Sequence, residues 1–83
     1  MKVAVRYFAS VREALGTGES LEIASGATVG AVRDVLIGRD AAHAAVLERG
    51  RAVRCALNQV LSDEGAVVPE GAEIGFFPPV TGG

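Results

Sequence analysis

The side chains most often used in catalysis are few in this chain, and none of them forms a reactive pair. His43 lies in the run Ala-Ala-His-Ala-Ala, with no nucleophile or acid at a suggestive spacing, so we expect an ordinary surface position on a helix. Cys55 has the inward parity of a strand, which favours a buried structural thiol over a reactive thiolate. The pair Asp63-Glu64 is interpreted as a solvated loop. The sequence therefore predicts no bound cofactor, no metal site and no enzyme that works alone.

The end of the chain is a better candidate for chemistry. Its last six residues are uncharged and read Pro78-Pro79-Val80-Thr81-Gly82-Gly83. Because glycine has no Cβ, a Gly-Gly end can enter a tunnel that other residues would block. The terminal carboxylate has a reference pKa of about 3.3–3.7, so it is an anion and a poor electrophile at neutral pH. It would react only after conversion to an acyl-phosphate-type anhydride, which requires a partner that uses a nucleotide.

The length and composition of the chain argue against several other classes of function. A chain of 83 residues holds one small domain. Its net charge of −2 argues against nucleic-acid binding, and the absence of a basic cluster argues against a charged membrane patch. No stretch approaches the roughly 20 apolar residues of a membrane span. The N-terminus alternates too strictly for a signal peptide, so we expect a cytoplasmic protein.

Hydrophobic periodicity predicts an α+β fold, in which one mixed sheet is covered on its apolar face by a main helix at residues 29–37. Strict alternation places Val3, Val5 and Tyr7 on the inner face of the first strand. Strands are expected at 2–8, 18–24, 51–57, 60–61 and 73–77, and further helical segments at 9–15 and 41–48.

Helix-capping residues mark the starts of these helices. Ser10 is placed to cap the first helix through a capping box, while Thr28 and Asp40 are placed to cap the later two. In the main helix, the spacing of the apolar residues predicts that Arg33 faces water.

The outward face of the sheet is unusually apolar. Phe8, Ala56 and Phe77 project there by parity, and Phe77 directly precedes the tail. Such a cluster usually marks a partner surface, although scattered exposed apolar residues are also common in soluble proteins.

Over its whole length the sequence resembles the small subunit of molybdopterin synthase. The most specific piece is Phe-Phe-Pro-Pro-Val-Thr-Gly-Gly at 76–83, supported by Tyr-Phe-Ala at 7–9, Val-Arg-Glu at 11–13 and the Asn-Gln turn at 58–59. The resemblance implies a ubiquitin-like β-grasp domain at 1–77 with an extended tail at 78–83. Members of the family are sulfur carriers, in which a ubiquitin-activating-type enzyme uses ATP to adenylate the terminal glycine. The adenylate becomes a thiocarboxylate, which donates sulfur to precursor Z in molybdopterin synthesis.

The resemblance also assigns roles to particular residues. Gly83 would carry the activated acyl group, and Gly82 would provide clearance. The tail would insert into the large subunit, in an assembly of two small and two large chains, and the catalytic side chains would lie on the large subunit. The expected partner-binding residues are Phe8, Arg12, Leu61, Phe77, Pro78, Pro79, Val80 and Thr81.

Three other hypotheses fit the sequence. A small protein modifier shares the fold and the Gly-Gly end, and would form isopeptide bonds with lysines of other proteins. A carrier for thiazole synthesis or for transfer RNA thiolation would use the same activation chemistry. A β-grasp binding domain whose tail has no function would not use this activation chemistry.

Overall fold

The computed structural model describes residues 1–79, so the predictions for Val80, Thr81, Gly82 and Gly83 fall outside the described residues. The predicted division into a domain at 1–77 and a tail at 78–83 stays a prediction. The elements follow in the order β1 (Lys2–Tyr7), α1 (Ala9–Leu15), β2 (Gly18–Glu22), α2 (Val29–Ile37), α3 (Ala41–Leu47), β3 (Arg54–Leu57), β4 (Val60–Ser62) and β5 (Glu73–Phe77).

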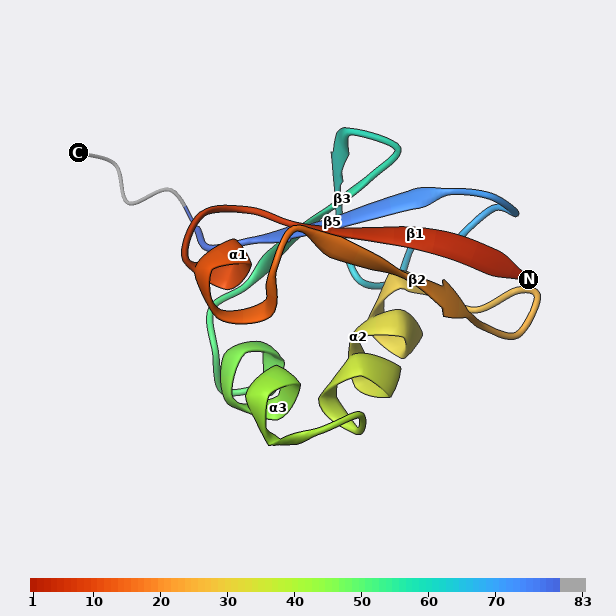
Figure 1. Ribbon diagram of the computed structural model, residues 1–83. Coiled ribbons are helices and arrows are strands. Elements are labelled where there is room, and N and C mark those ends of the chain that lie inside the picture. The colour runs from red at the N-terminus through yellow and green to blue at the C-terminus, as the bar shows by residue number, and fades with distance from the viewer. Residues whose placement is uncertain (80–83) are drawn as a thin grey trace.

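The strands form one mixed sheet in the order β2-β1-β5-β3-β4, and the three helices lie on one side of it (Figure 1). The central pair, β1 and β5, is parallel, whereas the other neighbouring strands pair in the antiparallel sense. Because Tyr7 lies opposite Phe76, both central strands end at the same edge of the sheet. The chain therefore leaves β5 next to the start of α1.

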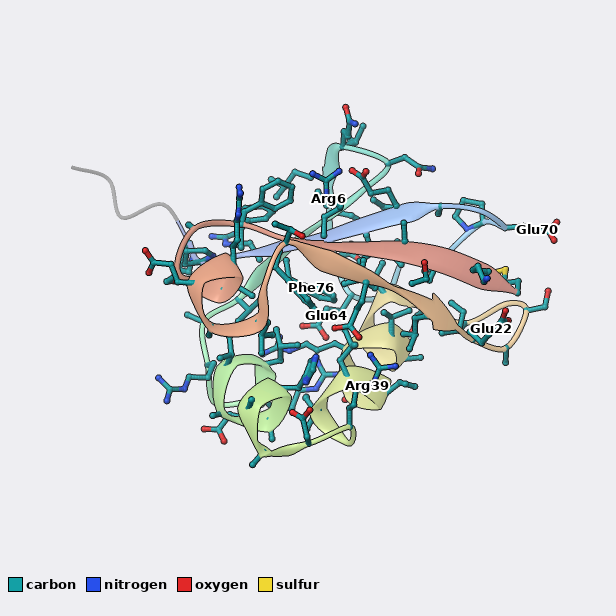
Figure 2. All side chains as sticks on the ribbon, in the orientation of Figure 1. Arg6, Glu22, Arg39, Glu64, Glu70 and Phe76 are labelled. Atoms are coloured by element: carbon teal, nitrogen blue, oxygen red, sulfur yellow. The ribbon has the colours of Figure 1, made fainter. Side chains whose placement is uncertain are left out.

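The core lies between the sheet and the helices. Val3, Val5 and Tyr7 of β1 are buried, as their alternation predicted, and Val29, Val32 and Leu36 of α2 pack in the same cluster. Figure 2 shows Phe76 on the helix side of the sheet and Arg6 on the opposite side. The predicted α+β fold, with α2 on the apolar face of a mixed sheet, is confirmed.

The predicted cap of α1 is wrong. The N-cap is Phe8, whose side chain makes no capping hydrogen bond, and the Phe8 carbonyl accepts from the N–H groups of Val11 and Arg12. Helix α1 follows β1 without a loop, and Ala9 takes a positive φ of 53° at the junction. The turn therefore falls two residues before the place that a Ser10 cap would need. The caps expected at Thr28 and Asp40 are confirmed, because their side chains accept from the N–H groups of Ala31 and His43.

Arg33 is buried, with 4% of its surface exposed, which overturns the prediction that it faces water. Its guanidinium donates to the carbonyls of Leu47 at 2.7 Å, Glu48 at 2.8 Å and Arg51 at 3.1 Å, and to the Glu64 carboxylate at 2.9 Å. The last carbonyls of an α-helix have no hydrogen-bond donor within the helix. At the end of α3, Arg33 donates to two of these carbonyls, those of Leu47 and Glu48. Periodicity within α2 could not reveal this role, because it depends on α3 packing alongside.

The structure also corrects two further predictions. Glu64 is not a fully solvated loop residue, since it is half-buried and pairs with Arg33 and Arg49. The strand expected at 51–57 begins only at Arg54, because residues 51–53 carry the chain from α3 back to the sheet.

Replacing Arg33 with methionine is expected to lower the free energy of unfolding by about 3–5 kcal/mol, because it removes a donor from each of three carbonyls and one of the two arginines that pair with Glu64. Denaturant unfolding followed by circular dichroism measures the change. Arg54→Met is the matched control, since Arg54 is exposed, and we expect a loss below about 0.5 kcal/mol. Equal stabilities of the two variants would contradict the bridging role of Arg33.

His43 is buried rather than exposed on a helix surface, so that prediction is wrong. Its Nδ1 lies 2.7 Å from Asp40 Oδ1, and its Nε2 lies 2.8 Å from Glu19 Oε2. The Tyr7 hydroxyl donates to the same Glu19 oxygen at 2.7 Å, and Arg39 pairs with the other. The cluster joins α3 to β2 and β1, so His43 is a structural residue whose partners lie far away in the sequence.

Burial raises the pKa of Tyr7 from 10.0 to about 12, although the charge of Arg39 offsets part of the effect. The raised value favours the protonated phenol in the fold, so its stabilising contribution is complete below about pH 10 and is lost as the pH rises toward 12. We expect stability to fall by up to about 1.4 kcal/mol per pH unit in that window. Urea unfolding at several alkaline pH values measures the slope, and Tyr7→Phe should flatten it. An equally steep slope in the variant would exclude Tyr7 as the cause.

Candidate functional site

Strand register brings small and apolar residues together on the face of the sheet that the helices leave open. Leu61 of β4 lies opposite Ala56 of β3, Ala56 lies opposite Gly75 of β5, and Gly75 lies opposite Arg6 of β1. Residues directly opposite each other point to the same side of a sheet. Leu61 is 65% exposed, and its neighbour Val60 is also exposed. The row therefore ends in an open apolar edge at the β3–β4 hairpin.

Phe8 covers the centre of this row. A Cβ built on Gly75 would lie 3.0 Å from Phe8 Cε2 and 3.9 Å from the Ala56 Cβ, so the aromatic ring lies over the glycine. Gly75 is buried although it points outward, whereas Phe8 stays 40% exposed. The missing side chain at Gly75 allows the ring to lie close to the sheet while it stays partly exposed to solvent.

Phe77 extends the surface to the root of the tail. It is the last residue of β5, lies opposite Arg54 and is half-buried. Pro78 and Pro79 follow at once, both half-buried. We call this surface the apolar platform, and it consists of Phe8, Ala56, Leu61, Gly75 and Phe77. The structure thus gathers Phe8, Leu61 and Phe77 on one face, with the two prolines at its edge.

Charged groups border the apolar platform. The Arg6 guanidinium carbon lies 5.9 Å from the Phe8 ring centroid, and its Nη1 lies 3.5 Å from Glu73 Oε1. Arg12 is exposed on α1, and no ion pair within residues 1–79 includes it. Its predicted partner role stays a prediction, as do the roles of Phe8, Leu61 and Phe77.

Cys55 is buried on the opposite side of the sheet, as predicted. Its thiol lies 3.3 Å from the carbonyl of Ser62, and burial raises the pKa of the thiol, helped by the charge of Glu64. A raised pKa leaves little thiolate at neutral pH, so this side chain is poorly suited to carrying reactive sulfur.

Sequence reasoning missed Arg6 and Gly75. Arg6 and Phe8 are two residues apart in the first strand, so the alternation already indicated that both lie on the outward face of the sheet. A glycine inside a strand often marks a close approach by another group, and Gly75 had that signal too. Within the described ranges, no cluster of three or more potential metal ligands occurs. The arrangement leaves a partly exposed apolar surface beside the base of the tail.

A helix-covered mixed sheet in the order β2-β1-β5-β3-β4 places this chain among ubiquitin-like β-grasp proteins. The ThiS family pattern matches residues 5–83, so the chain belongs to the ThiS family. The molybdopterin synthase sulfur carrier subunit of Escherichia coli strain K12 is 38% identical over 81 residues, which cover 98% of this chain and 99% of that protein.

Solved structures show the same likeness. The crystal structure of SAMP1 from Haloferax volcanii aligns with a TM-score of 0.79 and 27% identity, covering all of both chains. A complex of subunits 1 and 2 of the molybdopterin-converting factor from Helicobacter pylori also contains a similar chain. That chain aligns with a TM-score of 0.69 and 25% identity, again over all of both chains. The predicted family and β-grasp fold are confirmed.

Within the described part of the chain, the structure holds no helix of the length and apolarity that crossing a bilayer requires.

Proposed function

We propose that this chain is the sulfur carrier subunit of a molybdopterin synthase, with the carboxylate of Gly83 as its working group. The observation that carries the proposal is full-length similarity to a sulfur carrier subunit of that enzyme, in a chain that ends in Gly-Gly. The apolar platform supports it, because it provides a docking surface directly beside the base of the tail.

The chemistry takes place at the end of the backbone. The Gly83 carboxylate attacks the α-phosphorus of ATP on an activating enzyme, which releases pyrophosphate and leaves an acyl adenylate. A sulfur donor at the oxidation level of sulfide then displaces AMP and gives the thiocarboxylate. Its sulfur is a soft anionic nucleophile that attacks a carbon of precursor Z on the large subunit and displaces an oxygen leaving group, which joins carrier and substrate through a thioester. Water then cleaves the acyl–sulfur bond, which restores the Gly83 carboxylate and leaves the sulfur on the product. We place these steps in the cytoplasm, in an assembly of two small and two large subunits.

Each part of the chain has a separate task in this scheme. The globule presents the apolar platform, on which the activating enzyme and the large subunit compete. The prolines at 78 and 79 favour an extended path away from the sheet, because their φ angles are fixed and they donate no N–H. Gly82 leaves the acyl carbon accessible within a narrow channel. In this scheme the catalytic side chains come from the partners.

Purified components test the proposal. The chain, carrying a thiocarboxylate made by its activating enzyme, is mixed with the large subunit and precursor Z, and dithiolene formation is followed. We expect product to form in proportion to the thiocarboxylate supplied, and none from the carboxylate form. Product that forms equally well from the untreated carboxylate form would exclude the carrier role.

Protein modification is a second candidate, favoured by the structural similarity to SAMP1. In that reaction the activated Gly83 carbonyl would be attacked by a lysine amine of another protein, which would release the activating group and form an isopeptide bond. Mass spectrometry of lysine-containing peptides from cell extract separates the two functions. Gly-Gly remnants that depend on this chain would support modification, whereas their absence with intact dithiolene synthesis would support sulfur transfer alone.

A further inference from the structure

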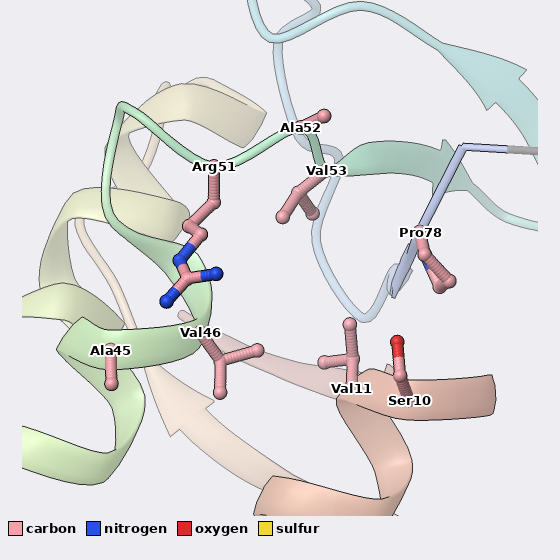
Figure 3. A pocket seen from close by; sticks show the side chains of 8 residues that line it. All are labelled: Ser10, Val11, Ala45, Val46, Arg51, Ala52, Val53 and Pro78. Atoms are coloured by element: carbon pink, nitrogen blue, oxygen red, sulfur yellow. The ribbon is translucent and has the colours of Figure 1, made fainter.

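A groove of about 400 Å³ lies on the helix side of the sheet, away from the apolar platform. Val11 of α1, Ala45 and Val46 of α3, and Val53 form its walls, and Pro78 stands at one end (Figure 3). Its volume is enough for one or two bulky side chains. Since Pro78 is the first residue after β5, the groove lies at the base of the tail.

One polar group dominates the groove. Figure 3 shows the guanidinium of Arg51 extending into it beside Val46. The Arg51 side chain is 61% exposed, and its ion pair within residues 1–79 is a long one, with 3.9 Å between Nε and Glu48 Oε1. Within the same residues no side-chain hydrogen bond from its guanidinium is formed. A guanidinium has five donors in a planar fork, which suits a carboxylate.

Ser10 adds a second donor at the opposite wall. Its hydroxyl is exposed, does not cap α1 and lies near Pro78 (Figure 3). The groove thus combines aliphatic walls with an arginine and a hydroxyl. This combination is complementary to an apolar side chain that stands next to a carboxylate.

We propose that this groove binds a segment of the large subunit that receives the tail, with an apolar side chain against Val46 and Val53 and a carboxylate paired with Arg51. The inference rests on the proposed function, because a partner must approach Pro78 in order to take up residues 80–83. Charge complementarity at Arg51 and continuity with the base of the tail favour this occupant. The partner would then hold the base of the tail from both sides of the sheet.

The chain's own tail is a poorer match. It also carries a carboxylate, but after its two prolines Val80 is the one aliphatic side chain, followed by threonine and two glycines. Such a segment has too little apolar surface to cover the aliphatic walls.

Two substitutions and one matched control test the groove. Arg51→Glu reverses the charge of an exposed side chain, and Ala45→Glu places a carboxylate in the groove from an exposed position on α3. Ala42→Glu makes the same change at an exposed α3 position outside the groove. Calorimetric titration of each full-length variant with the large subunit, and separately with the activating enzyme, measures the dissociation constants. Circular dichroism confirms that each variant is folded.

We expect Arg51→Glu and Ala45→Glu to weaken binding to the large subunit by about tenfold or more, and Ala42→Glu to change it less than about twofold. The affinity of the original chain should also depend more strongly on salt than that of Arg51→Glu. Unchanged affinity of both groove variants for the large subunit would overturn the inference, whatever their affinity for the activating enzyme. If a Phe77→Asp variant weakened binding to the large subunit in that case, the proposed function would stand without the groove.

Nuclear magnetic resonance tests whether the groove is instead occupied by the chain's own tail or by a second copy of the chain. Amide shifts of Ala45, Val46 and Ala52 are compared in the isolated chain with and without residues 80–83, and at several concentrations. Constant shifts support a groove that stays open for the partner. Shifts that depend on the tail would assign the groove to the chain's own end, and shifts that depend on concentration would assign it to a second copy. Either result would overturn the proposal.

Discussion

A chain that lacks Gly83 is expected to form no thiocarboxylate that the large subunit can use, and dithiolene synthesis should fall to the level seen without carrier. The reason is the position of the reacting carbon. Without Gly83 the acyl group moves back to Gly82, about 3.5 Å short of its place in the partner's active site. A misplacement of even 1 Å can reduce a reaction rate about a hundredfold. The assay is dithiolene formation with purified activating enzyme and large subunit.

Stability measurements separate this effect from unfolding. Gly83 follows β5 by six positions, so its removal leaves every described element intact in sequence. We expect the truncated chain to unfold at the same denaturant concentration as the full chain, and to remain bound to the large subunit through the apolar platform. A truncated chain that still supported synthesis at the normal rate would rule out the carrier role.

Replacing Phe77 with aspartate is expected to weaken binding to the large subunit by more than about 2 kcal/mol, which is typical of an interface hot spot. Phe77 lies at the junction of the apolar platform and the tail, so a partner that holds both must enclose it. An aspartate there would lose its hydration in the interface, a cost that pairing with Arg54 on the neighbouring strand would offset only in part. Calorimetric titration of the folded variant measures the change.

Two further substitutions make this test specific. Leu61→Asp alters the exposed edge of the apolar platform, and we expect weaker binding there too, by about 1–2 kcal/mol. Val35→Asp is the control, because Val35 is 49% exposed on α2, on the helix side of the sheet. It should leave the affinity within about 0.5 kcal/mol of the original. Equal losses for Val35→Asp and Phe77→Asp would remove the platform from the proposed interface.

The strands and the main helix could be predicted because their signals are local. Alternation in residues 2–7 places Val3, Val5 and Tyr7 inside, and the Thr28 cap begins α2 where its side chain can reach the N–H of Ala31. Errors arose where a residue is held by distant partners. Arg33 completes the end of α3, and His43 joins carboxylates of β2 and of the α3 cap, so neither burial could be deduced from its own helix.

In the candidate site, too, local patterns were predictable, whereas contacts between distant segments were not. Parity placed Phe8, Ala56 and Phe77 on the outward face, and the register of the strands confirms that Ala56 shares a row with Leu61 and Gly75. The position of the Phe8 ring over Gly75 depends on how β1 ends and α1 begins, which the pattern alone did not reveal. The groove around Arg51 was missed for a similar reason, since α1, α3 and Pro78 meet only in the folded chain.

The mass of the intact protein tests most directly whether the backbone terminus is the working group. The chain is purified from cells that also produce its activating enzyme, and its mass is compared with that of the chain produced without the enzyme. We expect a gain equal to the replacement of one oxygen atom by sulfur, located by fragmentation at Gly83. An unchanged mass in the presence of an active enzyme, or sulfur located on Cys55 instead, would contradict the account.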